Sequence, residues 1–256
     1  MSPALAARFS LEGRVALVTG ASGGLGARFA RVLAEAGASV VLAARRVERL
    51  EALAAELPRA VAVPLDLTEP GAVAPAFDAA EAALGAPVDV LVNNSGIAEP
   101  GATLDQPEEA WARTWAVNLD GARRMGVEAA RRLIDAGRPG SMVNVASILG
   151  LRQGAGVSAY ATSKAALIQL TKQMALEWAR HGIRVNALAP GYVETDINRA
   201  FFGTDAGRAL LGRVPMRRLG QPEELDGALL LLASDAGAFI TGSVLVADGG
   251  HVVSGL

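Results

Sequence analysis

Two residues that could move a proton stand four positions apart, Tyr160 and Lys164 in the stretch YATSK. Positions i and i+4 lie on one face of a helix, so the phenol and the ammonium would be neighbours there. A free phenol has a pKa of about 10, which is too high for an efficient base at neutral pH, and a nearby cation lowers it. The spacing therefore predicts a proton-transfer pair. The alternative is an ordinary helix that carries two polar side chains.

A glycine-rich stretch, TGASGGLG from Thr19 to Gly26, follows the first apolar run of the chain. A glycine turn between a strand and a helix suits a dinucleotide pyrophosphate, because the backbone can approach the phosphates and the helix offers free N–H groups. Glycines at 20, 24 and 26 do not match the GxGxxG register, and a plain tight turn is the alternative. The position after the first predicted strand favours the phosphate loop.

The residues after the second apolar run indicate which dinucleotide is bound. That run ends in Arg45 and Arg46, and the first acidic residue is Glu48. A carboxylate there would favour NAD(H), whereas arginine suits a 2′-phosphate. We therefore predict NADP(H), with NAD(H) as the other candidate cofactor. The alternative is that both arginines are solvated residues at a helix start.

The composition predicts a globular chain that is not built for nucleic acid. Of 256 residues, 51% are hydrophobic and 20% are charged, and the net charge is -2 with a pI of about 5.8. A phosphate-binding footprint needs clustered excess base, so nucleic acid is not an expected partner. With no cysteine and two histidines, no metal site is expected. The first residues have no sustained apolar run, and the run at 227–233 is shorter than the roughly 20 residues of a membrane span. We expect a cytoplasmic protein without a membrane partner.

Strand-like and helix-like segments alternate along the whole chain, and the strands are nearly all apolar. This pattern predicts an α/β fold with a parallel sheet of about seven strands, helices on both faces and a single domain over residues 1–256. The segment 191–220 is the least regular and is predicted to be a substrate-binding lid. The predicted strands are 15–18, 39–43, 60–65, 88–92, 141–145, 184–188 and 243–246, and the predicted helices are 25–36, 46–57, 72–84, 108–136, 159–181 and 223–233.

Seven short motifs in one order give the chain a family resemblance. From about Leu11 to Gly250 it resembles the short-chain dehydrogenases/reductases, through TGASGGLG (19–26), Asp66-Leu67, NNSG (93–96), Asn118, Ser147, YATSK (160–164) and Pro190-Gly191. The resemblance implies a Rossmann-like, doubly wound sheet and an NAD(P)-dependent ketone reductase or secondary-alcohol dehydrogenase. Ser95 is a departure, since the family more often has alanine there.

The resemblance also implies roles for single residues. The implied catalytic set is Asn118, Ser147, Tyr160 and Lys164, with Tyr160 as acid and base and Asn118 holding a water. The implied cofactor contacts, beside Arg45, Arg46, Tyr160 and Lys164, are Gly20, Ser22, Gly24, Leu25, Gly26, Asp66, Leu67, Asn93, Ser95, Gly96, Pro190, Gly191, Val193 and Thr195. Structural alternatives stay open for Ser147 as a cap, Asn118 as a local helix residue and Asp66 as a turn residue.

The substrate is left open by the sequence. Two classes compete, 3-oxoacyl thioesters on one side and small or cyclic ketones, sugars or steroid-like alcohols on the other. The candidate pocket residues predict a largely apolar pocket with no evident anchor for a carboxylate; they are Ile97, Leu149, Gln153, Tyr192, Phe201 and Phe202. The alternative function is a non-catalytic NADP(H)-binding sensor or scaffold. Members of the family are commonly tetramers, which implies a homotetramer, although a dimer is the other candidate.

Overall fold

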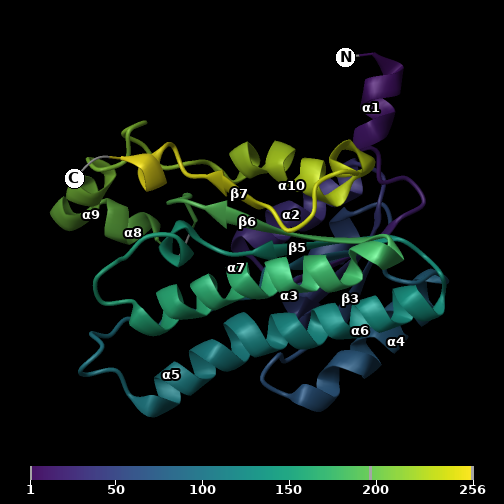
Figure 1. Ribbon diagram of the computed structural model, residues 1–256, viewed down its shortest axis with the longest axis horizontal. Coiled ribbons are helices and arrows are strands. Elements are labelled where there is room, and N and C mark those ends of the chain that lie inside the picture. The colour runs from purple at the N-terminus through teal and green to yellow at the C-terminus, as the bar shows by residue number, and fades with distance from the viewer. Residues whose placement is uncertain (1, 196–197, 255–256) are drawn as a thin grey trace.

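One parallel sheet organises the protein. In the computed structural model, which describes residues 2–195 and 198–254, seven strands lie in the order β3-β2-β1-β4-β5-β6-β7. The predicted α/β fold with a doubly wound sheet is confirmed (Figure 1). The strands are β1 (Val15–Thr19), β2 (Ser39–Ala44), β3 (Ala60–Pro64), β4 (Val90–Asn93), β5 (Gly140–Val145), β6 (Ile183–Pro190) and β7 (Val244–Ala247).

Helices cover both faces of the sheet because each central strand is apolar on both sides. In β1, Ala16 and Val18 pack with α2, α3 and α10, whereas Val15 and Leu17 pack with α4, α6 and α7. The two faces are thus built from alternate residues of the same strands. The helices are α1 (Pro3–Phe9), α2 (Gly24–Glu35), α3 (Val47–Glu56), α4 (Val73–Leu84), α5 (Glu108–Trp115), α6 (Ala122–Asp135), α7 (Ser158–Trp178), α8 (Arg199–Phe202), α9 (Asp205–Leu211) and α10 (Asp226–Ala233).

The strand order reverses between β1 and β4, which lie side by side although two strands separate them in sequence. At such a point the connections leave toward opposite faces, so a crevice opens at the carboxyl ends of the strands. The glycine stretch follows β1, and NNSG begins at the last residue of β4. The fold therefore brings these two motifs to the same crevice.

The helix predicted over 108–136 is present as an unbroken run of helical backbone over 108–135, but it is not α-helical throughout. A π-helical turn, η2 (Ala116–Gly121), separates α5 from α6. Its cause is a tertiary contact, because the Asn118 side chain pairs with the backbone of Ile97 in both directions. Gly121 also lies where a β-carbon would come within 2.8 Å of Leu67. A π turn inside a helix often marks a functional site.

Three other segments differ from the expectations. The segment after β6 is more regular than predicted, because it contains α8 and α9, and its residues 196 and 197 lie outside the described residues. The last predicted helix begins as a 3-10 turn, η5 (Pro222–Leu225), before α10. The sequence also gave no prediction for α1, which projects from the body at the N-terminus and buries none of its residues (Figure 1). Among the described residues, no helix is both long and apolar enough to cross a membrane.

Substitution of Phe77 tests the packing of α4 on the sheet. Its ring is fully buried among β-strand and helix side chains, so Phe77→Ala is expected to lower the free energy of unfolding by about 3–5 kcal/mol. The matched control is Phe239→Ala, at a fully exposed phenylalanine, with an expected change within about 0.5 kcal/mol. Urea unfolding followed by circular dichroism measures both. Equal losses in the two variants would contradict this packing.

Candidate active site

The proton-transfer pair lies on the first turns of α7, as the spacing predicted. The Lys164 ammonium is 5.7 Å from the centre of the Tyr160 ring. Tyr160 is half-buried and Lys164 is 3% exposed, so the cation is the more enclosed of the two. The short distance results from the helical i, i+4 geometry.

Lys164 is held at the carboxyl end of β5. Its Nζ donates to the carbonyl oxygen of Val145 at 2.8 Å. Burial disfavours the charged form and lowers the pKa of Lys164 from 10.5 to about 8. At neutral pH the group is therefore still mostly a cation, and it keeps donors beyond the one that Val145 accepts.

Ser147 and Tyr160 come together from different elements. Ser147 caps the 3-10 turn η3 (Ile148–Gly150), where its Oγ accepts from the N–H of Leu149 at 3.1 Å. Burial raises the pKa of Tyr160, and a hydrogen bond with Ser147 lowers that pKa in part. The net direction is opposite to the lowering expected from the lysine. Burial has the largest effect on this pKa and the charge of Lys164 is not among its causes, so the phenol is protonated at neutral pH.

Asn118 lies in the π turn behind the pair. Its Nδ2 donates to the Ile97 carbonyl at 2.9 Å and to Ser163 Oγ at 3.0 Å, and its Oδ1 accepts from the Ile97 N–H at 2.9 Å. A β-carbon added at Gly96 would lie 3.3 Å from Lys164 Nζ and 3.5 Å from Asn118 Oδ1. The side chain thus fixes the backbone beside Lys164 and has little bonding capacity left for a water.

The glycine stretch forms the turn between β1 and α2. Gly20 and Gly24 adopt left-handed φ angles of 70° and 53°, which favour glycine. A β-carbon at Gly24 would meet no atom within 4 Å, whereas one at Gly26 would lie 2.3 Å from the Gly20 carbonyl oxygen. Gly26 therefore serves close packing of the turn, and Gly24 leaves the backbone open at the helix N-terminus. Leu25 is half-buried on α2, facing the core.

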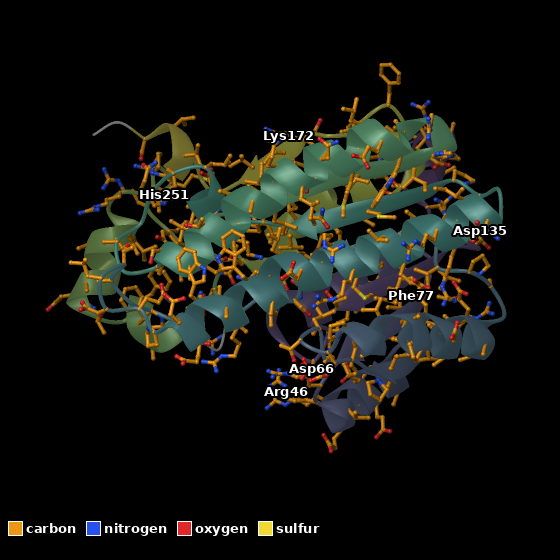
Figure 2. The ribbon with its side chains drawn as sticks, turned by 60° about the horizontal axis from the view of Figure 1, so that its bottom comes forward. Arg46, Asp66, Phe77, Asp135, Lys172 and His251 are labelled. Carbon is orange, nitrogen blue, oxygen red and sulfur yellow. The ribbon has the colours of Figure 1, made fainter. Side chains whose placement is uncertain are left out.

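The two arginines directly follow the end of β2, beside that turn. Arg46 donates to Ser22 Oγ, at 2.9 Å from one terminal nitrogen, so it bridges β2 to the glycine turn. The positive charge of Arg45 lowers the pKa of Asp66, after the larger effect of the Thr68 N–H that Asp66 accepts at 2.9 Å. Figure 2 shows Arg46 and Asp66 at the same edge of the protein. Asp66 also serves as a turn residue, which was the structural alternative.

The residues at the ends of β4 and β6 have mainly supporting contacts. Asn93 is buried and donates to Asn144 Oδ1 at 2.9 Å, and Thr19 Oγ1 accepts from the N–H of Ser95 at 3.0 Å. The carbonyl of Leu67 accepts from Arg124, and the N–H of Gly191, directly after Pro190, donates to Ala247.

The segment after β6 contacts two other parts of the chain. Val193 is buried opposite Gly220. Thr195 lines a cavity of about 690 Å³ together with Ser22, Gly23 and Gly24, so the segment 191–220 reaches the glycine turn.

The expected pocket residues divide into two groups. Tyr192 packs edge-on against Phe202 with ring centres 5.5 Å apart, and Phe202 packs against Phe201 at 5.1 Å. Leu149 and Ile97 are half-buried and adjoin Ser147 and Asn118 through backbone hydrogen bonds, whereas Gln153 is exposed. Burial has the largest effect on the pKa of Tyr160, and Tyr192 raises that pKa further.

The sequence missed three residues beside this aromatic group. His251 lies 5.4 Å from Tyr192, measured between ring centres, and the charges of Arg152 and Arg213 act on both rings. No short motif could have found them, because Arg152 and His251 are 99 positions apart in sequence. Only the course of the chain after β7 brings them together.

The residues fit a nicotinamide dinucleotide. The turn presents an open glycine backbone at a helix N-terminus, the adenosine end carries two arginines, and a buried ammonium with unused donors stands at the other end. The sheet edge between β1 and β4 connects these ends. Fold and site together define a class, the NAD(P)-dependent oxidoreductases with a Rossmann-like sheet.

Comparison with known proteins identifies the family. The sequence model described as enoyl-(acyl carrier protein) reductase matches residues 20–252. A cis-4-hydroxycyclohexanecarboxylate dehydrogenase from Sinomonas cyclohexanicum is 43% identical over 93% of this chain and 96% of its own. The 3-oxoacyl-[acyl-carrier-protein] reductase of Vibrio cholerae is 38% identical over 94% of this chain and 98% of its own.

Solved structures agree with this assignment. A gluconate 5-dehydrogenase from Burkholderia cenocepacia, crystallised with NADP and tartrate, matches with a TM-score of 0.93 and 37% identity, covering 98% of this chain and 100% of its own. The chain belongs to the short-chain dehydrogenase/reductase family and is an NAD(P)-dependent oxidoreductase.

The buried cation predicts an unusual pH dependence of stability. Unfolding restores the ordinary pKa of 10.5, so between pH 8 and 10.5 the unfolded chain takes up a proton that folded Lys164 lacks. The wild type is therefore expected to gain stability relative to Lys164→Met, by up to about 3 kcal/mol, as the pH rises through that window. Urea unfolding of both proteins at pH 7 to 10 measures the difference. If the free energy of unfolding changed with pH equally in the two proteins, Lys164 would have an ordinary pKa in the folded state.

Proposed function

We propose that the protein transfers a hydride between NADP(H) and a carbonyl or secondary-alcohol substrate, with Tyr160 as the acid and base. The observation that carries the proposal is the meeting of Ser147, Tyr160 and Lys164 at the carboxyl end of β5. The relatives give no support to a non-catalytic sensor, since those named above are dehydrogenases or reductases.

Each side chain has a separate task. NADP(H), when bound, supplies or accepts the hydride. Tyr160, kept protonated by burial, donates its proton to the carbonyl oxygen in reduction and takes it back in oxidation. Ser147 accepts from Leu149 and so keeps its own proton for the substrate oxygen. Lys164 bonds Val145 and has donors left to orient the ribose hydroxyls and to stabilise a phenolate.

Replacement of Tyr160 tests the proposed chemistry. Tyr160→Phe keeps the ring and removes the proton, so kcat for ketone reduction is expected to fall by about 10²–10⁴-fold. NADPH oxidation with a panel of ketones measures it. The matched comparison is Tyr192→Phe, at the other tyrosine of the chain, with an expected loss below about tenfold. Retention of activity in Tyr160→Phe would refute this role.

The arginines after β2 are proposed to select NADP(H). Arg46 already bridges to Ser22, and Arg45 is exposed beside Asp66, so a 2′-phosphate there would meet two guanidinium groups. NADP in the Burkholderia relative and in two further solved neighbours supports this choice over NAD(H).

Charge reversal at this position separates the two cofactors. Arg45→Asp is expected to lower kcat/KM for NADPH by about 10–100-fold and to leave that for NADH within about threefold. Steady-state kinetics with both cofactors measures the ratio, and Arg8→Asp on the projecting α1 is the control. An unchanged ratio in Arg45→Asp would place the 2′-phosphate elsewhere.

The substrate is proposed to be a small or cyclic ketone or alcohol. The aromatic group of Tyr192 and Phe202 forms an apolar wall, and the names of the relatives include both a cyclic alcohol and a sugar acid. We propose that the segment 191–220 closes over this substrate, because it carries that wall and reaches the glycine turn through Thr195.

We also propose that the protein is a homotetramer. Exposed leucine and isoleucine side chains on the outer helices, Leu176 on α7 and Ile134 on α6, support contact with further copies. The C-terminal residues 255 and 256, part of the expected contact region, lie outside the described residues. The cytoplasmic location stays a prediction.

A further inference from the structure

Arg152 carries a positive charge that is not paired with a carboxylate of the described residues. Its guanidinium donates to the carbonyl oxygen of His251 and, at 2.9 Å, to Ser254 Oγ. Both acceptors are uncharged, and over residues 2–195 and 198–254 no carboxylate lies within ion-pair distance of this group. The two bonds fix the arginine against the C-terminal 3-10 turn η7 (His251–Val253) without consuming its charge.

Arg213, after α9, adds a second such charge. Its side chain is exposed, and it makes no hydrogen bond or ion pair with the part of the chain that the structure describes. Burial raises the pKa of Tyr192 and lowers that of His251, and the charges of Arg152 and Arg213 lower both values. The carboxylate of Asp248 acts on His251 in the opposite direction. Two guanidinium groups from distant parts of the chain therefore act on one aromatic group. Arg218, by contrast, forms an ion pair with the carboxylate of Glu224.

A buried imidazole at the same place lacks a hydrogen-bond partner. His251 is 6% exposed, and its Nδ1 has no partner among the described residues. Leaving such an atom unsatisfied is costly, and a polar ligand atom would remove the cost. Figure 2 shows His251 at the end of the protein far from Arg46 and Asp66, so this group is separate from the adenosine end of the cofactor site.

The group is placed to hold the far end of a substrate. Tyr192 packs against the His251 ring and edge-on against the buried Phe202, and it also acts electrostatically on Tyr160. A molecule with its carbonyl at Ser147 and Tyr160 would run along this aromatic wall toward the arginines. Its other end would meet two cations and an unsatisfied imidazole.

We propose that Arg152 and Arg213, with His251, form a subsite for a carboxylate at the end of the substrate opposite its carbonyl. The inference rests on the proposed function and narrows its substrate to an oxo acid or hydroxy acid with a compact apolar body. A guanidinium fork matches the two oxygens of a carboxylate, and charge-assisted hydrogen bonds are the strong ones. The sequence predicted no evident carboxylate anchor, because the three residues meet only in the fold.

A pair of ketones that differ only in charge tests the subsite. With NADPH as cofactor, 4-oxocyclohexanecarboxylate is compared with 4-oxocyclohexanecarboxamide, its neutral counterpart. The wild type is expected to favour the carboxylate by at least tenfold in kcat/KM. Arg152→Gln and Arg213→Gln are each expected to lower kcat/KM for the carboxylate by about 10–100-fold, mainly through KM, and to leave the amide within about twofold.

Control variants separate charge from stability. Arg213→Gln removes no hydrogen bond or ion pair with the described residues, so its kinetics stay interpretable even where Arg152→Gln loosens the C-terminal turn. Arg152→Lys keeps the charge and is expected to recover part of the carboxylate preference. Arg8→Gln, on the projecting α1, is expected to leave kcat/KM unchanged for both ketones.

The outcomes distinguish this inference from the function on which it rests. Equal turnover of both ketones, unchanged by either arginine variant, overturns the subsite and leaves the oxidoreductase function intact. If neither ketone nor a wider panel is reduced, the proposed function fails. Where neither ketone turns over but others do, calorimetry with cyclohexanecarboxylate on the NADP⁺ complex decides, and binding that is absent or equal in wild type and Arg213→Gln overturns the subsite.

Discussion

The buried ammonium of Lys164 is the constraint on which the active site depends. A lysine 3% exposed is costly to keep charged, and the protein offsets that cost with one backbone carbonyl at the end of β5. The remaining donors and the charge are then available at one point, between the phenol of Tyr160 and the open edge of the sheet. Strand β5 and helix α7 are both needed, since one supplies the acceptor and the other sets the i, i+4 spacing.

The rest of the fold serves this arrangement from a distance. The reversal of strand order between β1 and β4 places the glycine turn and the NNSG stretch in one crevice. In the π turn, the Asn118 side chain donates hydrogen bonds to the Ile97 carbonyl and to Ser163 Oγ. These bonds fix the backbone that faces Lys164. Burial raises the pKa of Tyr160 while Ser147 lowers it, so the phenol is held ready as an acid and needs the adjacent cation to act as a base.

Much of this could be predicted from the sequence, because it depends on local periodicity. The apolar runs gave the seven strands to within a few residues, and the four-residue spacing gave the Tyr160–Lys164 pair. The π turn could not be predicted, since it results from a contact between positions 97 and 118 and not from the helix pattern around it. The arginines and the histidine beside Tyr192 were missed for the same reason, as no local spacing connects positions 152, 213 and 251.

The pH dependence of alcohol oxidation under single-turnover conditions tests the central claim most directly. With NADP⁺ and alcohol saturating, the wild type is expected to show one apparent pKa for the proton acceptor, which belongs to the coupled pair of Tyr160 and Lys164. In Lys164→Met the same apparent pKa is expected to rise, because the phenolate loses its neighbouring cation and stays buried. An apparent pKa that is identical in the two proteins would contradict the account.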